Sequence, residues 1–126
     1  MKYYEIDLNG EPIKLRLTSN SICEIEHKTN KSILDLMKEI TQTNVVSFLM
    51  YMRRFEVPNF GTKDANELYD KFIDAGYSMQ DILFKVIYEG LVVSGIMTKE
   101  ELQQLKEITG IREKKVKEQI EEITQE

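Results

Sequence analysis

The chain has little of what a metal site, a cofactor site or an active site usually needs. Its 126 residues include one cysteine and one histidine, and its six glycines are scattered rather than gathered in a phosphate-binding loop. A single cysteine excludes an intrachain disulfide and favours a reducing compartment. We therefore expect no cofactor and no bound metal, and we assign no catalytic, cofactor-binding or metal-ligating residue.

A long uninterrupted apolar run is also missing. The most apolar stretch, residues 82–97, is interrupted by Lys85 and Glu89 and is short for a membrane span. The N-terminal sequence MKYYEIDLNG has no apolar region of the kind found in secretory signals. These absences predict a cytoplasmic protein that does not contact a membrane.

Basic residues are outnumbered, 17 against 22 acidic ones, which gives a net charge of -5. A protein that binds nucleic acid needs a concentrated positive surface, so this balance argues against such a partner. The apolar share of 41% is ordinary for a globular protein, and the length is enough for one domain with a real core.

The most informative stretch that is present runs from Ser78 to Gly95. Ser78 and Asp81 have the spacing of a capping box, and Gly95 suits the left-handed position after a helix end. Between them a broad apolar stripe recurs at helical spacing, formed by Met79, Ile82, Leu83, Val86, Ile87 and Leu91. A second stripe, formed by Phe84, Tyr88 and Val92, covers another face. A helix that is apolar on most faces is normally buried, so we expect this one at the centre of the core.

The only β structure is expected in residues 3–17. Apolar and polar residues alternate there on both sides of Asn9-Gly10, which is a strong signal for a two-residue hairpin turn. Pro12 cannot donate a hydrogen bond, so it should lie near the start of the second strand or face outward.

The rest of the chain is predicted to be helical. Further helices are expected from Thr18 or Ser21 to about residue 28, from 32 to 40, from an Asn44 cap to about 55, from a Thr62 cap to Gly76, and from Thr98 to Gly110. The fold class is therefore mainly α, with an N-terminal β-hairpin packed on a compact multi-helix bundle and a charged C-terminal helix. Residues 1–97 form the hairpin and helical core domain, and residues 98–126 form a charged helical extension, either mobile in part or used for oligomerisation.

Cys23 and His27 are four residues apart on a predicted helix, which is a spacing that metal ligands use. Structural zinc needs four ligands, and because no other Cys or His exists, carboxylates such as Glu24 would have to complete the set. A Cys–His nucleophile pair would likewise lack a third group. We therefore prefer a small buried cysteine and a surface histidine.

Basic residues concentrate in two places only. These are Arg53-Arg54 and the run Arg112, Lys114, Lys115 and Lys117, which Glu113 and Glu118 interrupt. Such mixing of charges is typical of a solvated helix face.

The order of features from Leu15 to Gly95 resembles a known protein family. The features are LRLT, then IEHKTN, SILDLM and ELYDKFIDAGYSMQDI, and finally a helix that ends in VSG. In this order they are similar to the tail assembly chaperones of long-tailed, siphovirus-type bacteriophages of Gram-positive hosts and of related prophages. This chain departs from the family's usual pattern at two places, Thr29-Asn30 and Ile96-Met97. The resemblance does not extend beyond Met97.

The resemblance implies a small helical protein that is not an enzyme and is absent from the finished virion. Such proteins coat the aggregation-prone tape measure protein while tail tube subunits polymerise around it. In many of these phages a longer form, made by a ribosomal frameshift, recruits the tail tube protein. The implied partners are therefore the tape measure protein and, through the longer form, the tail tube protein, with no nucleic acid and no membrane.

Two other classes of function stay open from the residues alone. A small helical regulatory or nucleic-acid-binding protein would need a basic recognition helix, and a small enzyme would need a polar pocket. Adaptable apolar contact surface could come from Met37, Met50, Met52, Met79 and Met97, although filling of core gaps is the preferred interpretation. We also expect self-association through Val116, Ile120 and Ile123, so removal of the chain after Thr109 should lower the mass measured by light scattering.

Overall fold

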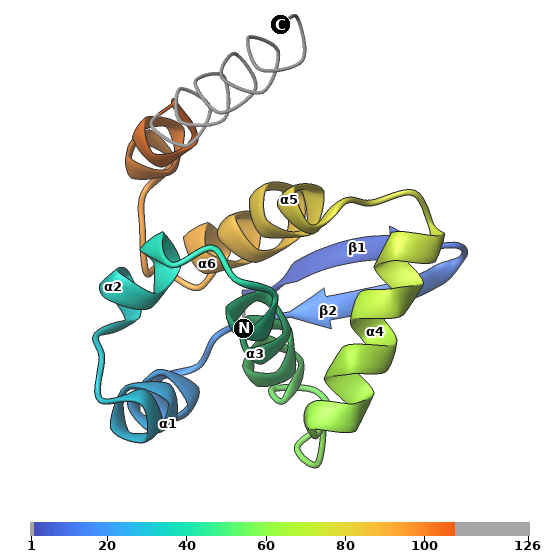
Figure 1. Cartoon of the computed structure of the whole chain (residues 1–126), viewed down its shortest axis with the longest axis horizontal. Coiled ribbons are helices and arrows are strands. Elements are labelled where there is room, and N and C mark those ends of the chain that lie inside the picture. The colour runs from blue at the N-terminus through green and yellow to red at the C-terminus, as the bar shows by residue number, and fades with distance from the viewer. Residues whose placement is uncertain (1, 108–126) are drawn as a thin grey trace, which may run out of the picture. The chain divides into compact units, whose positions relative to one another are not determined.

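The computed structural model describes residues 2–107, which fall into two compact units, Met1–Ile96 and a second unit that begins at Met97. The first unit is mainly helical with one N-terminal hairpin, which confirms the predicted fold class (Figure 1). Its elements are β1 (Tyr4–Leu8), β2 (Glu11–Leu15), α1 (Ser19–Thr29), α2 (Ile33–Lys38), α3 (Gln42–Arg53), α4 (Thr62–Asp74), α5 (Met79–Asp81), η1 (Ile82–Ile87) and α6 (Tyr88–Val93). Among the described residues, no helix has the length and apolar character that a membrane span requires.

The hairpin forms as the sequence predicts. Asn9 and Gly10 both have positive φ, 53° and 89°, as the two-residue turn with the right-handed strand twist requires. The strands pair antiparallel with Leu8 opposite Glu11 and Tyr4 opposite Leu15. Pro12 is the second residue of β2 and is exposed, as expected.

Helix α1 begins after Thr18, whose hydroxyl accepts a hydrogen bond from the Ser21 amide, and ends at Asn30 in the left-handed conformation. The short helix α2 begins after Ser32, whose hydroxyl accepts from the Asp35 amide. It ends at Lys38, two residues earlier than the pattern suggested, and this leaves Ile40 exposed in the link that follows.

Helix α3 is buried from Val45 to Met52, with Ser47 as the one exception in that stretch. Its cap is Thr41, whose hydroxyl accepts from the Asn44 amide, so the predicted Asn44 cap is wrong by one helical turn. Helix α4 is capped at Gly61 instead of Thr62, because the Asp64 carboxylate accepts from the Gly61 amide at 2.9 Å.

The stretch after Ser78 forms one continuous helical segment in three parts, α5, η1 and α6. The predicted capping box is present, with the Ser78 and Asp81 side chains each accepting from the other residue's amide. The segment ends in two hydrogen bonds, from Gly95 N to Val92 O and from Ile96 N to Leu91 O, which form the motif that glycine favours at helix ends.

A π-helical turn inside this segment was not predicted. In η1 the hydrogen bonds reach back five residues, as from the Tyr88 amide to the Leu83 carbonyl. The wider turn changes the angular positions of the side chains, so of the second predicted stripe only Tyr88 is buried.

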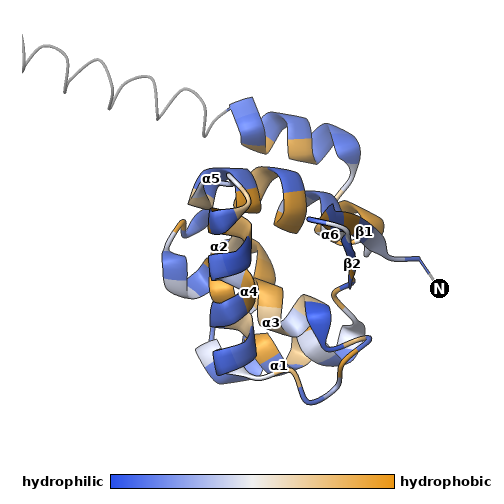
Figure 2. Ribbon diagram, turned by 90° about the vertical axis from the view of Figure 1, so that its right-hand side faces the viewer, coloured by the Kyte–Doolittle hydropathy of each residue, from blue (hydrophilic) through white to orange (hydrophobic). Residues whose placement is uncertain are grey.

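The core of the first unit lies where α3 and the η1–α6 segment meet the inner face of the hairpin. Side chains with no measurable exposure come from each of these elements and include Leu15, Leu49, Met52, Val86 and Leu91. Figure 2 shows hydrophobic residues concentrated at α3. The predicted central helix therefore shares the centre of the core with α3.

The second unit begins with a helix over residues 99–107 within the described part. The Thr98 hydroxyl accepts from the Glu101 amide, as the capping pattern predicts. The expected end of this helix at Gly110 and the whole charged tail lie outside the described residues.

Candidate functional site

We take as the candidate site an open cavity of about 280 Å³ that is lined by residues of α1, α2, α3 and the start of α4. We call it the α1–α3 groove. Its apolar wall consists of Ile25, Leu36, Phe48, Met50 and Tyr51, and its polar rim of Lys28, Thr29, Asn44, Ser47 and Thr62. An apolar floor with a few polar groups at the rim is typical of a site that receives an apolar group of a ligand or partner.

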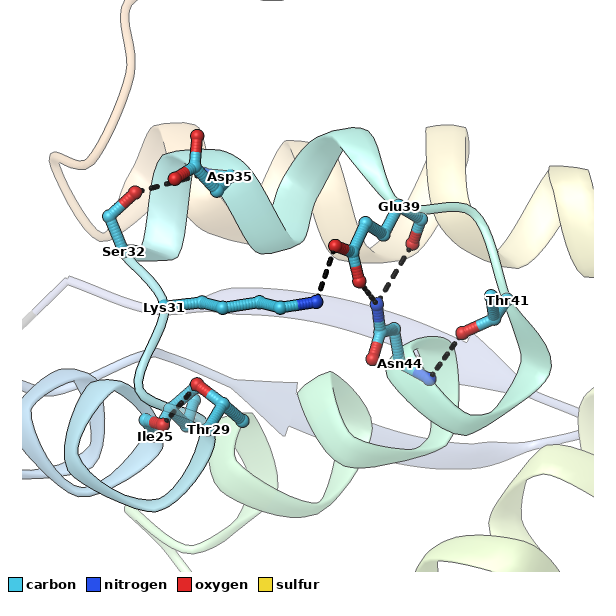
Figure 3. Close-up of polar contacts among 8 residues, drawn as sticks. All are labelled: Ile25, Thr29, Lys31, Ser32, Asp35, Glu39, Thr41 and Asn44. Atoms are coloured by element: carbon cyan, nitrogen blue, oxygen red, sulfur yellow. Dashed lines mark hydrogen bonds and ion pairs between the residues drawn. The ribbon is translucent and has the colours of Figure 1, made fainter.

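Helix α2 contributes Leu36 to the lining of the groove and is held at both ends by polar contacts (Figure 3). At its start the Glu26 carboxylate accepts from the Ile33 amide at 2.9 Å. Across its length, Lys31 from the preceding loop reaches Glu39 in the following loop at 2.6 Å. The Asn44 amide group donates to the Glu39 carbonyl at 3.0 Å, which ties this loop to α3.

These contacts affect the Glu39 carboxyl. The hydrogen bond from Lys31 lowers the pKa of Glu39 below its ordinary value, and a second hydrogen bond, from the Asn44 side chain to the Glu39 carboxylate at 3.4 Å, acts in the same direction. Glu39 is therefore held charged and in place as part of the frame around α2. It is not a proton donor of the kind that acid catalysis requires.

Arg54 holds the opposite end of the groove. Its guanidinium donates to the Phe60 carbonyl at 2.9 Å and to the Glu24 carboxylate at 3.2 Å, and lies 4.9 Å from the centre of the Tyr51 ring. These contacts connect α1, the end of α3 and the loop before α4. They also hold the Tyr51 ring in the apolar wall.

Lys28 is the only charged residue among those that line the groove. It is exposed and has no ion-pair partner within residues 2–107. The groove therefore combines an apolar wall with one cation that is free to meet a negative group of a partner.

Cys23 and His27, the residues considered for metal binding or nucleophilic catalysis, both lie on α1 and are both exposed. The expectation of a buried cysteine was wrong, because α1 turns Ser21 and Ile25 inward instead. The described residues hold no group of three or more His, Cys, Asp or Glu side chains placed to bind a metal ion.

The pKa shifts of the other titratable groups are explained by their structural surroundings. The backbone hydrogen bond from Ser78 lowers the pKa of Asp81, which belongs to the capping box. Burial raises the pKa of Tyr4, and it raises that of Tyr88 to about 12. Because these groups do not meet at one site, they do not form an acid–base pair.

The basic pair Arg53-Arg54 is occupied by contacts within the chain. Arg53 donates to the Lys14 carbonyl and pairs with Glu56, both at 3.2 Å, while Arg54 makes the contacts given above. Neither side chain contributes to an open positive surface. The second basic run, residues 112–117, lies outside the described residues.

Most of the methionines fill the core, as the preferred interpretation predicted. Met37, Met50 and Met52 are buried in the first unit, where Met79 is half-buried, and Met97 begins the second unit. Met50 has a further role, since it lines the α1–α3 groove.

The groove itself was not predicted from the sequence. Its walls come from helices whose relative placement depends on Arg54 and on the Lys31–Glu39 pair, and neither contact has a sequence signature. The exposure of Leu34 and the early end of α2, which leave this region less covered than the rest, became visible only in the structure.

No protein-family model matches the chain, and neither a curated protein nor a solved structure shows significant similarity to it.

Proposed function

We propose that the protein is a tail assembly chaperone of a siphovirus-type phage or prophage, which binds the tape measure protein without catalysing a reaction. In a longer frameshifted form it would also bind tail tube subunits. The observation that carries the proposal is the α1–α3 groove, an open site with an apolar wall, of which two segments that carry the resemblance form a part. The IEHKTN segment includes Ile25 and Lys28, and the SILDLM segment includes Leu36.

The size of the groove fits one apolar side chain of a partner helix better than a whole small molecule. A chaperone for a long helical protein needs modest contacts that repeat along the partner and are released when tube subunits arrive. Burying one large apolar side chain contributes about 1.5–3 kcal/mol, which is enough for a repeated but reversible contact.

Lys28 favours a partner segment that carries a negative charge beside the apolar side chain. An apolar side chain that enters the groove, with a carboxylate one helical turn away, would place that carboxylate near the Lys28 ammonium group. We therefore infer that the segments held by this protein are amphipathic helices with acidic residues beside their apolar stripe.

The alternative of a small nucleic-acid-binding regulator receives less support from the same surfaces. Arg53 and Arg54 donate to backbone carbonyls and pair with carboxylates, and the outer face of α4 mixes Lys63 and Lys71 with acidic residues. A recognition helix instead needs an uninterrupted positive face.

Co-expression of the full chain with the tape measure protein encoded downstream tests this function. The proposal predicts that the tape measure protein becomes soluble and co-purifies with this chain. A tape measure protein that stays insoluble and is not retained would contradict the proposal. Retention of DNA or RNA in a purification at moderate salt, lost after nuclease treatment, would support the regulator instead.

A further inference from the structure

The two strands of the hairpin differ in how their outer edges are protected. In a two-residue hairpin the pair beside the turn is hydrogen-bonded, and the following pairs alternate. Leu8–Glu11, Ile6–Ile13 and Tyr4–Leu15 therefore bond across the ladder. The backbone polar groups of Glu5 and Asp7 on β1, and of Pro12 and Lys14 on β2, turn outward.

The outer edge of β2 is closed. Pro12 has no N–H to offer, and the Lys14 carbonyl accepts from Arg53 at 3.2 Å. Just beyond the strand, the Arg16 amide donates to the Met52 carbonyl of α3 at 2.9 Å. Each of these features prevents another strand from pairing along β2.

The outer edge of β1 has no such protection. The outward backbone groups of Glu5 and Asp7 make no hydrogen bond within the described part of the chain, and both side chains are exposed. The helical segment packs on the inner face of β1 instead, where the Tyr4 hydroxyl donates to the Lys85 carbonyl at 2.9 Å. An exposed edge of this kind is a template for an added strand.

The charges on β1 select the kind of strand that can add. Antiparallel pairing with a second copy, centred on Ile6, would place Glu5 of each copy opposite Asp7 of the other, and like charges directly opposite are destabilising. A partner strand with Lys or Arg opposite Glu5 and Asp7 would instead be attracted at both positions. We propose that the outer edge of β1 binds an extended segment of another protein that carries basic residues at alternate positions.

This surface is separate from the α1–α3 groove, so its test is independent of the tape measure proposal. The full chain, labelled with ¹⁵N, is titrated with two short capped peptides that alternate valine with lysine or valine with glutamate. The proposal predicts that the amide signals of Glu5 and Asp7 shift with the lysine peptide. Binding of the glutamate peptide should be weaker by about tenfold, the effect of exchanging two attractive cross-strand pairs for two repulsive ones.

Two variants separate backbone pairing from simple charge attraction. Asp7→Pro removes the outward N–H at the position opposite Pro12 and should abolish the shifts, while Asp7→Asn, which keeps the N–H, should retain them in weakened form. The double variant Glu5→Lys with Asp7→Lys should reverse the preference between the two peptides. This variant keeps the proposal testable if Asp7→Pro does not fold.

Three results would overturn the proposal. These are the absence of shifts in residues 3–8 with the lysine peptide, equal binding of both peptides by the wild-type chain, and shifts of the same amides on raising the protein concentration alone. The last result would mean that a second copy occupies the edge.

Discussion

The Tyr88 hydroxyl donates a hydrogen bond to the backbone carbonyl of Met37 at 2.9 Å, joining residues 51 positions apart in the sequence. Both residues are buried. Met37 lies in the last turn of α2, where carbonyls lack partners within the helix, and Tyr88 begins α6. The bond therefore fastens α2, which lines part of the α1–α3 groove, to the core of the unit.

Replacing Tyr88 by phenylalanine should lower the free energy of unfolding by about 1–2 kcal/mol, because the Met37 carbonyl would be left buried without a partner. Denaturant unfolding measures the loss. Relative to the wild type, the variant should also show a larger increase in the rate of amide hydrogen exchange in α2 than in α4. Tyr69→Phe is the matched control, since Tyr69 is also buried but its hydroxyl has no hydrogen bond within residues 2–107. Equal losses in the two variants would show that the Tyr88 bond does not hold α2.

Because the Tyr88 hydroxyl is buried, the protein should also lose stability at alkaline pH. Burial raises the pKa of Tyr88 to about 12, above its ordinary value of 10.0. Because the neutral form is favoured in the folded state, this contribution is fully present below pH 10 and is lost as the pH rises towards 12. The difference in unfolding free energy between wild type and Tyr88→Phe should therefore be constant up to about pH 10 and then shrink. A difference that stays constant to pH 12 would contradict the assignment.

Gly90 on α6 lies against the side chain of Met52 on α3. A Cβ at position 90 would overlap the methyl group of Met52, a side chain with no measurable exposure. Gly90→Ala gains about 1 kcal/mol of helix propensity, but the overlap in a packed core costs about 1–3 kcal/mol. We expect a net loss of stability in the wild-type background. In a Met52→Ala background the overlap is absent and the same change should be stabilising. Additive effects in this double-mutant cycle would rule out the contact.

Local signals in the sequence were sufficient for most of the elements. The Asn9-Gly10 turn, the Ser78–Asp81 capping box and the Gly95 helix end each depend on neighbouring residues only, and each is confirmed. Of the two caps considered for α1, Thr18 and Ser21, the structure uses Thr18. Cap positions that had two candidates within one turn were less certain. Thr41 and Gly61 were missed because Asn44 and Thr62 are themselves good caps by residue type.

Features that depend on distant contacts could not be predicted from local pattern. The π turn in η1 changes which side chains after it face the core, and Gly90 is a packing residue inside a helix instead of a turn residue. The α1–α3 groove depends on Arg54, whose partners Glu24 and Phe60 come from different segments. Arginine and glutamate are usually solvated, so sequence alone gave no reason to pair them.

The most direct test of the central claim fills the groove and measures retention of the tape measure protein. Ser47 lies on α3, is half-exposed and lines the groove, so Ser47→Tyr should occupy the space that a partner's side chain would use. Thr43→Tyr adds the same side chain at an exposed position of the same helix outside the groove. We predict that Ser47→Tyr weakens binding of the co-expressed tape measure protein by about tenfold or more, with an unchanged melting temperature, because one buried apolar contact is lost. Thr43→Tyr should bind like the wild type. Wild-type binding by a folded Ser47→Tyr variant would contradict the assignment of the groove as the binding site.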